Sequence, residues 1–222
     1  MLDTTTISQS TDKKALAYEL IKNKIIEGEL QPLSDISEDE LQRELDISRT
    51  PIREALQKLQ KEGFVYIYPR KGTIVAEVTE DLIKEIYYMR VLNEPHIVRQ
   101  ACRHIPVEWL QEKREAFLRP HPNLDPIGQR RYYMGLDRDL HMGFLKYCNN
   151  RFLENIMAVV YDHNHRIRLK VSDPRLYDGD HSIEEHIDII DAAISKEYDK
   201  IEAVVSLHVK NSCSISVRYF RR

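Results

Sequence analysis

Polar residues interrupt the apolar helical stripes in the second half of the chain at four positions: Asp137, His141, His186 and His208. Asp137 and His141 lie four residues apart on a face that they share with Phe144, so both side chains are expected to point inward. A buried carboxylate is costly unless it is paired or bound to a metal, so one acid and three imidazoles aimed at a core suggest a common centre. The Asp-x3-His spacing allows one helix to supply two ligands.

Each of these histidines also has a simpler interpretation, because a single histidine on an apolar face is more often a hydrogen-bonded core residue than a metal ligand. Only the set of four favours a site. The cysteines, Cys102, Cys148 and Cys213, are odd in number and far apart, which favours reduced thiols over a disulfide or a cysteine metal site.

The segment that must position these residues is predicted to be helical. From Thr79 onward the hydrophobic pattern predicts an antiparallel bundle of six or seven helices. Helix breaks are expected near Pro106, over residues 120–126, at Asn149-Asn150 and over residues 173–179. Only seven glycines occur in 222 residues, which also favours helix over sheet, and the protein is expected to be mainly α.

The first part of the chain has a different organisation. Apolar spacing predicts one helix over about residues 14–27, and the capping-box pair Ser37 and Glu40 opens a short helix through residues 41–45. A third helix is expected to begin near Ser48 and to end at Gly63. The preceding residues 1–13 are rich in Thr and Ser and are expected to be flexible.

Arg49 and Arg53 lie one turn apart near the start of the third predicted helix, away from its apolar stripe. Basic residues in this position of a helix-turn-helix reach base edges in the major groove, where guanine accepts the paired donors of arginine. Two expected strands, 64–68 and 73–75, flank a basic tip and resemble a wing that could touch phosphate or the minor groove. The pattern predicts a winged helix-turn-helix over residues 14–76, although the arginines alone could simply form a solvated face.

Several longer motifs extend over this region: Gly28-Glu-Leu-Gln-Pro32, Ser48-Arg-Thr-Pro-Ile-Arg-Glu-Ala-Leu56, Glu62-Gly63-Phe64 and Arg70-Lys-Gly72. Together they resemble the winged-helix domain of the GntR family. The resemblance implies that Arg49 and Arg53 read operator bases and that the wing around Gly72 completes the contact. The full predicted DNA interface also includes Arg43, Ser48, Thr50, Arg70 and Lys71. Leu33 stands where the family commonly has glycine. The acidic stretch Ser37-Glu-Asp-Glu40 leaves Arg43 as the only basic residue of the second helix, so base contacts are expected mainly from the third helix and the wing.

The second part carries further motifs: Asp137-Arg-Asp-Leu-His141, Asn150 with Leu153, Glu185-His186 through Ile194, and Leu207-His208. They resemble the FCD effector domain of the FadR-type branch of the GntR family. Arg90 with Glu94 fits that domain's Arg-x-x-Leu-Glu pattern, with Asn93 in place of leucine. The resemblance implies an all-helical domain, residues 77–222, that binds a divalent metal on Asp137, His141, His186 and His208 beside a pocket for a small organic acid.

The chemistry of this ligand set agrees with the resemblance. Three nitrogens and one oxygen suit zinc, nickel, manganese or iron, and coordination positions left open can accept a carboxylate or water. Arg90 and Arg168 are candidates to bind the effector's negative charge, because arginine offers a paired fork to a carboxylate. A structural salt bridge is an equally good interpretation of both arginines.

Length and charge agree with a two-domain regulator. A chain of 222 residues is comfortable for two domains, and its net charge of -3 argues against a protein that coats nucleic acid nonspecifically. Basic residues nevertheless outnumber acidic ones between Arg49 and Lys71. No signal peptide or segment long enough to span a bilayer is evident, so we expect a cytoplasmic protein.

These features predict a homodimeric, ligand-responsive transcriptional regulator that binds a palindromic operator. The simplest form is a repressor released by an organic acid bound beside the metal, without enzymatic activity. Two alternatives remain open. An open metal site could activate water in a hydrolase or isomerase with an appended DNA-binding module. In a direct metal sensor, the ion itself would be the signal.

Overall fold

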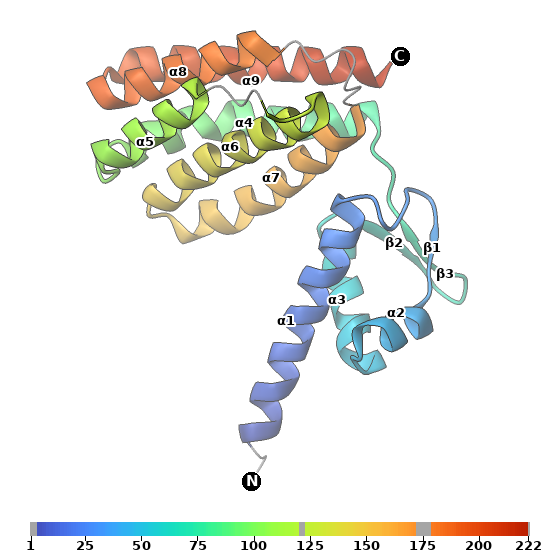
Figure 1. Ribbon diagram of the computed structural model, residues 1–222. Helices are drawn as coiled ribbons and strands as arrows, with labels where there is room; N and C mark the ends of the chain where they lie inside the picture. Colours follow the sequence, from blue (N-terminus) through green and yellow to red (C-terminus); the bar gives the residue numbers. More distant parts are fainter. Residues whose placement is uncertain (1–3, 120–122, 172–178, 222) are drawn as a thin grey trace. The chain divides into compact units, whose positions relative to one another are not determined.

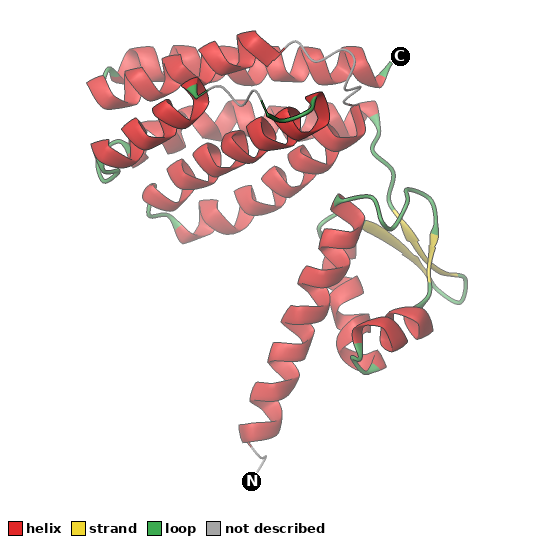
Figure 2. Ribbon diagram, in the orientation of Figure 1, coloured by secondary structure: helices red, strands yellow, loops and turns green. Residues whose placement is uncertain are grey.

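The computed structural model describes residues 4–119, 123–171 and 179–221. The chain divides into two compact units, Met1–Val78 and Thr79–Arg222 (Figure 1). Helices dominate the described residues, and their single sheet is small (Figure 2). The prediction of a mainly α protein with an N-terminal winged helix-turn-helix is confirmed.

The first unit is a three-helix domain with a small sheet. It contains α1 (Thr4–Ile26), β1 (Asp35–Ile36), α2 (Glu38–Leu45), α3 (Arg49–Lys61), β2 (Val65–Tyr68) and β3 (Gly72–Val75). Ile21 and Ile25 of α1 pack with Ile52, Leu56 and Leu59 of α3 in a core from which water is almost fully excluded. These residues recur every three or four positions, so burying them holds the outer face of α3 toward solvent.

The N-terminus differs from the prediction. We expected a flexible segment over residues 1–13 and a helix from about Lys14, but the structure has helical backbone from Thr4. No glycine or proline occurs between Thr4 and Ile26. Once the later turns of α1 are packed against α3, extending the helix backward requires no new nucleation and costs little.

The three strands form an antiparallel sheet in the order β1-β3-β2. Val65 pairs with Val75 and Tyr68 with Gly72, which places the basic tip between the paired ends of β2 and β3. Gly72 has φ 122°, a conformation that favours glycine. The strands begin one residue away from the predicted positions, and β1 was not predicted because two residues are too short to show alternation.

The second unit is a helical bundle. Its described helices are α4 (Glu80–Ala101), α5 (Val107–Leu118), α6 (Pro126–Tyr147), α7 (Arg151–Val171), α8 (Gly179–Ser195) and α9 (Tyr198–Phe220). α4 packs against α6, α7 and α9, and α8 packs between α5 and α9 (Figure 1). The predicted breaks include residues 120–122 and 173–178, which lie outside the described residues. This arrangement turns one face of each of α6, α8 and α9 toward a shared interior.

Candidate metal centre and DNA-binding surface

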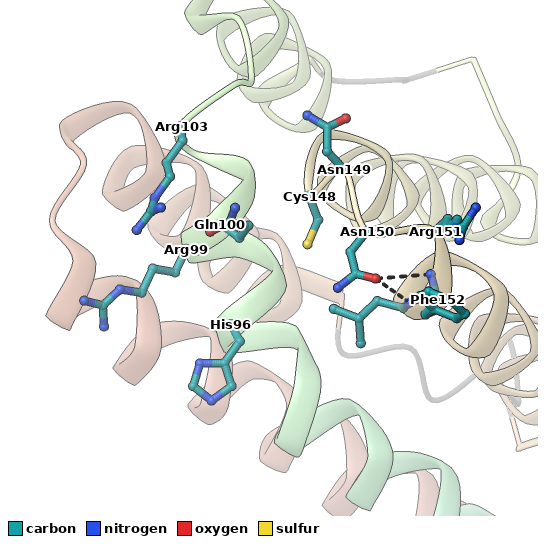
Figure 3. A pocket seen from close by; sticks show the side chains of 10 residues that line it. His96, Arg99, Gln100, Arg103, Cys148, Asn149, Asn150, Arg151 and Phe152 are labelled. Atoms are coloured by element: carbon teal, nitrogen blue, oxygen red, sulfur yellow. Dashed lines mark hydrogen bonds between the residues drawn. The ribbon is translucent and has the colours of Figure 1, made fainter.

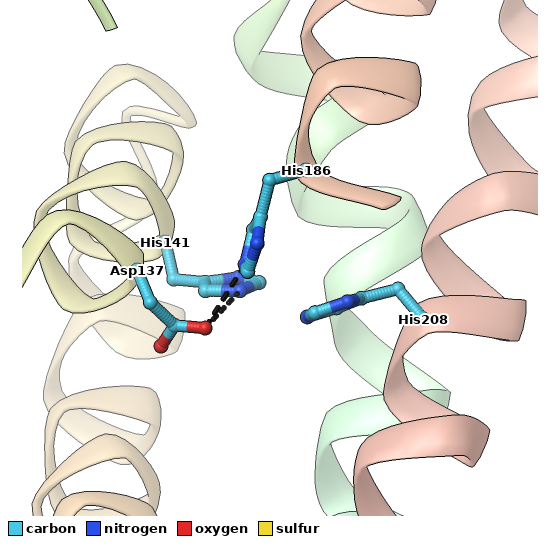
Figure 4. A group of neighbouring side chains, drawn as sticks. All are labelled: Asp137, His141, His186 and His208. Atoms are coloured by element: carbon cyan, nitrogen blue, oxygen red, sulfur yellow. Dashed lines mark ion pairs between the residues drawn. The ribbon is translucent and has the colours of Figure 1, made fainter. Parts of the chain in front are cut away.

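The four residues singled out by their position on apolar stripes come together inside the second unit (Figure 4). α6 supplies Asp137 and His141 from successive turns, α8 supplies His186, and α9 supplies His208. One potential ligand atom from each residue lies within 4.8 Å of the others, and all four side chains are buried. Residues separated by more than 70 positions in sequence therefore form one polar cluster in an apolar interior.

The Nδ1 atoms of the three histidines each lie next to an acceptor, on another helix for His141 and His208 and on the preceding turn for His186. His141 Nδ1 lies 3.1 Å from Glu94 Oε2, His186 Nδ1 lies 2.5 Å from the carbonyl of Ser182, and His208 Nδ1 lies 2.8 Å from Glu185 Oε2. Acceptors at Nδ1 hold the proton there, so each Nε2 presents a lone pair. Metal-binding histidines in proteins are commonly oriented by such partners.

The Nε2 atoms, by contrast, lack good partners among the described residues. His208 Nε2 has none, and His186 Nε2 has a 2.9 Å approach to Asp137 Oδ1 that does not count as a hydrogen bond. His141 Nε2 has two long contacts, 3.5 Å to Arg90 and 3.9 Å to Asp137 Oδ1. Buried polar atoms are normally hydrogen-bonded, and leaving them unpaired is costly. A divalent cation would satisfy all three nitrogens and the carboxylate, so the residues present fit a metal ion.

The protonation states of the four residues also suit metal binding. Burial lowers the pKa of His208 to about 3 and also lowers the pKa of His186, so both imidazoles are neutral at pH 7. Burial alone would raise the pKa of Asp137, but Arg168 and the nearby histidines hold it well below its usual value. Neutral imidazoles and an ionised carboxylate are the forms that coordinate metals.

The two predicted effector-binding arginines lie next to the cluster in different situations. Arg90 is almost fully buried and bound to Glu94 at 2.5 Å and to Asn164 at 2.9 Å. Arg168 pairs with Asp137 at 2.5 Å and lines a cavity of about 10 Å³ that also reaches His141. That volume accommodates about one water molecule, so a larger ligand requires Arg168 to move.

The predicted DNA-binding arginines lie on the exposed face of α3, but they are not solitary. Arg53 Nε lies 2.7 Å from Glu38 Oε2, and Arg49 contacts both Asp39 and Glu38 on α2. Arg43 donates a hydrogen bond to the carbonyl of Asp39. The acidic start of α2 therefore contacts the helix that carries the basic residues.

The other predicted DNA-binding residues are also on the surface of the first unit. Ser48 is the N-cap residue of α3 without a capping hydrogen bond, and Thr50 follows it in the first turn. Arg70, Lys71 and Gly72 are exposed at the tip between β2 and β3.

Sequence reasoning missed the roles of two groups of acidic residues. In the sequence Glu185 is only part of a motif, whereas in the structure its carboxylate on α8 lies within hydrogen-bond distance of His208 Nδ1 on α9. Glu38 and Asp39 were expected only to reduce DNA contacts, and their pairing with Arg53 and Arg49 was not anticipated. Helical spacing predicts which face of its own helix Glu38 or Glu185 occupies. It does not predict which residue of another helix either side chain contacts.

Comparison with known protein families matches both units. Residues 13–75 match bacterial regulatory proteins of the gntR family, and residues 85–211 match the FCD domain. The HTH-type transcriptional regulator YdhC of Bacillus subtilis is 26% identical over 200 residues, covering 88% of this chain and 87% of YdhC. The HTH-type transcriptional repressor RspR of Escherichia coli is 23% identical over 211 residues, covering 92% of this chain and 89% of RspR.

Solved structures share the fold. Escherichia coli McbR/YncC has a TM-score of 0.75 at 17% identity, covering 94% of this chain and 98% of that structure. The Zn²⁺-bound FCD domain of TM0439 has a TM-score of 0.52 at 17% identity, covering 65% of this chain and 98% of that domain. None of the described helices combines the length and apolar character needed to cross a membrane. The chain belongs to the GntR family of DNA-binding transcriptional regulators and carries an FCD domain after its winged helix-turn-helix.

Proposed function

We propose that this regulator is a dimeric, cytoplasmic repressor that binds a divalent metal and leaves its operator when a small organic acid binds beside that metal. The observation that carries the proposal is the buried set of three imidazoles and one carboxylate in the FCD domain. The repressor role is supported by the relative RspR, which is named a transcriptional repressor.

The DNA-binding surface consists of the exposed face of α3 and the tip between β2 and β3. Arg49 and Arg53 are exposed near the N-terminal end of α3, the position from which a recognition helix reads base edges. Arg70 and Lys71 supply positive charge at the tip for phosphate contact. Arg43, Ser48, Thr50 and Gly72 complete the proposed interface.

Asp137 and the Nε2 atoms of His141, His186 and His208 would hold the ion. When bound, the ion supplies open coordination positions that accept a carboxylate or water. Zinc is supported by the Zn²⁺-bound FCD domain of similar fold, while nickel, manganese and iron suit the same donor set.

The organic acid is expected to bind near Arg168 rather than Arg90. Arg90 is committed to Glu94 and Asn164 and almost inaccessible, whereas Arg168 lines the cavity beside Asp137. Once a metal shares the charge of Asp137, the guanidinium of Arg168 can bind an incoming carboxylate instead. The pocket must enlarge at the same time, so effector binding is coupled to a change in the helical unit.

The small size of that cavity also favours one alternative, a direct metal sensor. If no acid enters, the metal alone would be the signal, and Asp137 would bind it in place of Arg168. We favour regulation over metal-dependent catalysis, because the two glutamates that contact the cluster's histidines, Glu94 and Glu185, are already bound to Nδ1 atoms. A general base needs a carboxylate free to accept a proton.

Operator binding measured on metal-free and metal-loaded protein tests the proposal. The probes are the DNA upstream of the protein's own gene and random DNA of equal length, at physiological salt. We expect preference for the upstream DNA, little response to metal alone, and release by one or more organic acids in the metal-loaded protein. Absence of any preference would contradict the operator assignment, a response to metal alone would identify a sensor, and turnover of an acid that is lost in His186→Ala would identify an enzyme.

A further inference from the structure

One of the three histidines of the cluster is oriented differently from the other two. The Nδ1 atoms of His141 and His208 each lie next to a glutamate carboxylate on another helix. His186 Nδ1 lies instead 2.5 Å from the carbonyl oxygen of Ser182, one turn earlier in α8. Among the described residues, no carboxylate therefore orients His186 from its Nδ1 side.

An aromatic ring lies against His186 where the other two histidines have a carboxylate. Phe117, the second-to-last residue of α5, stacks on His186 with 4.8 Å between the ring centroids and 13° between the ring planes. The rings of His208 and His141 approach His186 at 58° and 71°, so of these three rings only that of Phe117 lies nearly parallel to it. Both stacked side chains are almost fully buried. Stacked rings at this separation attract each other beyond the burial of their surface.

Two contacts together define where the Nε2 atom of His186 points. A parallel neighbour fixes the plane of the imidazole, but the ring could still turn over about its Cβ–Cγ bond and exchange Nε2 with a carbon atom. The carbonyl of Ser182 removes this ambiguity, because only a ring nitrogen can donate a hydrogen bond to it. The carbonyl alone leaves the ring free to tilt about that hydrogen bond. Both contacts are needed to direct Nε2 toward the rest of the cluster.

α5 is itself held against the two helices that supply Asp137, His141 and His186. Near the start of α5, Trp109 packs edge-on against two aromatic rings of α6. A Cβ atom at position 143 of α6 would overlap the Trp109 ring, so the glycine there allows the close approach. Arg114 pairs with Asp191 of α8 through contacts of 2.7 and 3.3 Å. The stacked phenylalanine therefore projects from a helix that is fixed against both α6 and α8.

We propose that Phe117 is a positioning residue for metal binding: its ring fixes the plane of the His186 imidazole, so that Nε2 is directed at the ion. This inference rests on the proposed function, because it assigns a role toward the metal that the four-residue cluster would hold. Ligands that are already oriented bind more tightly, since less conformational freedom is lost on binding.

Replacing Phe117 with leucine removes the aromatic face and keeps most of the apolar volume. Zinc affinity of the full chain is measured by competition with a chelator. Folded Phe117→Leu should bind zinc about two- to tenfold more weakly than the parent, the range that corresponds to one aromatic pair. Phe117→Tyr keeps the stacked ring and should bind zinc within about twofold of the parent. Circular dichroism and the fluorescence of Trp109, the chain's single tryptophan, check that α5 stays in place.

Two matched controls separate this role from ordinary packing. Phe64→Leu removes a fully buried ring from the core of the first unit, and it should lower the melting temperature without changing zinc affinity. Phe152→Leu makes the same change on the surface of the second unit. Phe152 is 66% exposed and lines a cavity of about 700 Å³ to which no residue of the cluster contributes (Figure 3). Zinc affinity should again stay at the parent value.

The orientation of the ring is measured on metal-free protein by proton NMR of histidine-labelled samples. Ring protons of His186 that lie over the face of Phe117 resonate upfield because of its ring current. The His186 signal, assigned as the one missing from His186→Ala, should move downfield in Phe117→Leu and stay in place in Phe152→Leu.

The inference is wrong if folded Phe117→Leu binds zinc as tightly as the parent, if Phe64→Leu weakens zinc binding equally, or if the His186 signal does not move. In each of these cases a parent that binds zinc leaves the proposed metal centre standing. A parent that binds none of zinc, nickel, manganese and iron contradicts the metal centre of the proposed function and the inference with it.

Discussion

Removing the carboxylate of Glu185 should weaken metal binding although Glu185 does not reach the metal centre itself. Its Oε2 lies 2.8 Å from His208 Nδ1 and its Oε1 lies 2.6 Å from Asn211 Nδ2, so it orients the histidine and is itself held in place. In Glu185→Ala the buried Nδ1 loses its acceptor, and the ring is free to rotate or to change tautomer. Glu185→Gln keeps an acceptor oxygen but loses the negative charge.

The expected size follows from these contacts. Loss of a partner that orients a metal-binding histidine typically costs 10- to 100-fold in affinity, so Glu185→Ala should fall in that range, about 1.4 to 2.8 kcal/mol. Glu185→Gln should lose less, roughly threefold to tenfold, because the hydrogen bond to Nδ1 can persist. Asp188→Asn is the matched control, since it removes one exposed negative charge from the same helix.

Affinity is measured by competition with a chromogenic zinc chelator, and the metal-dependent rise in melting temperature gives an independent value. Circular dichroism of the metal-free variants checks that the bundle is folded. If folded Glu185→Ala binds zinc as tightly as the parent and Asp188→Asn, the reasoning that Glu185 orients His208 is refuted.

Two further predictions concern surface charges. Glu38→Gln with Asp39→Asn should raise affinity for random DNA by roughly two- to fivefold per carboxylate removed, because the arginines of α3 lose their acidic partners, and the gain should shrink with salt. Electrophoretic mobility shifts measure it, and an equal gain in the control Glu40→Gln would show that net charge alone is responsible. The pKa of Glu80 is lowered from 4.5 to about 2, chiefly by its hydrogen bonds with Arg221. Because the pKa of Glu80 is lower in the folded than in the unfolded protein, ionised Glu80 stabilises the folded state above pH 4.5. That stabilisation is lost as the pH falls toward 2. The parent should therefore melt slightly above Glu80→Gln at pH 6, the two should converge between pH 4.5 and 2, and a pH-independent difference would contradict the pair.

Much of the architecture was predictable from local pattern. The three-to-four-residue spacing of Ile52, Leu56 and Leu59 defines a helix whose inner face must be buried, whatever else surrounds it. The same reasoning identified Asp137 and His141 as inward-pointing, because one helix fixes their relation. The start of α1 was missed, since a helix that is nucleated elsewhere can extend through residues with no apolar pattern of their own.

The sequence by itself determined the two-part organisation, the helix faces, the family and the four residues of the candidate metal centre. Only the tertiary structure decided which partners those residues have. In the structure Glu185 contacts His208, Arg168 pairs with Asp137, and the acidic residues at the start of α2 pair with the arginines of α3. The physical reason is that helical periodicity fixes the direction of a side chain about its own axis, whereas a contact between helices depends on how the axes pack.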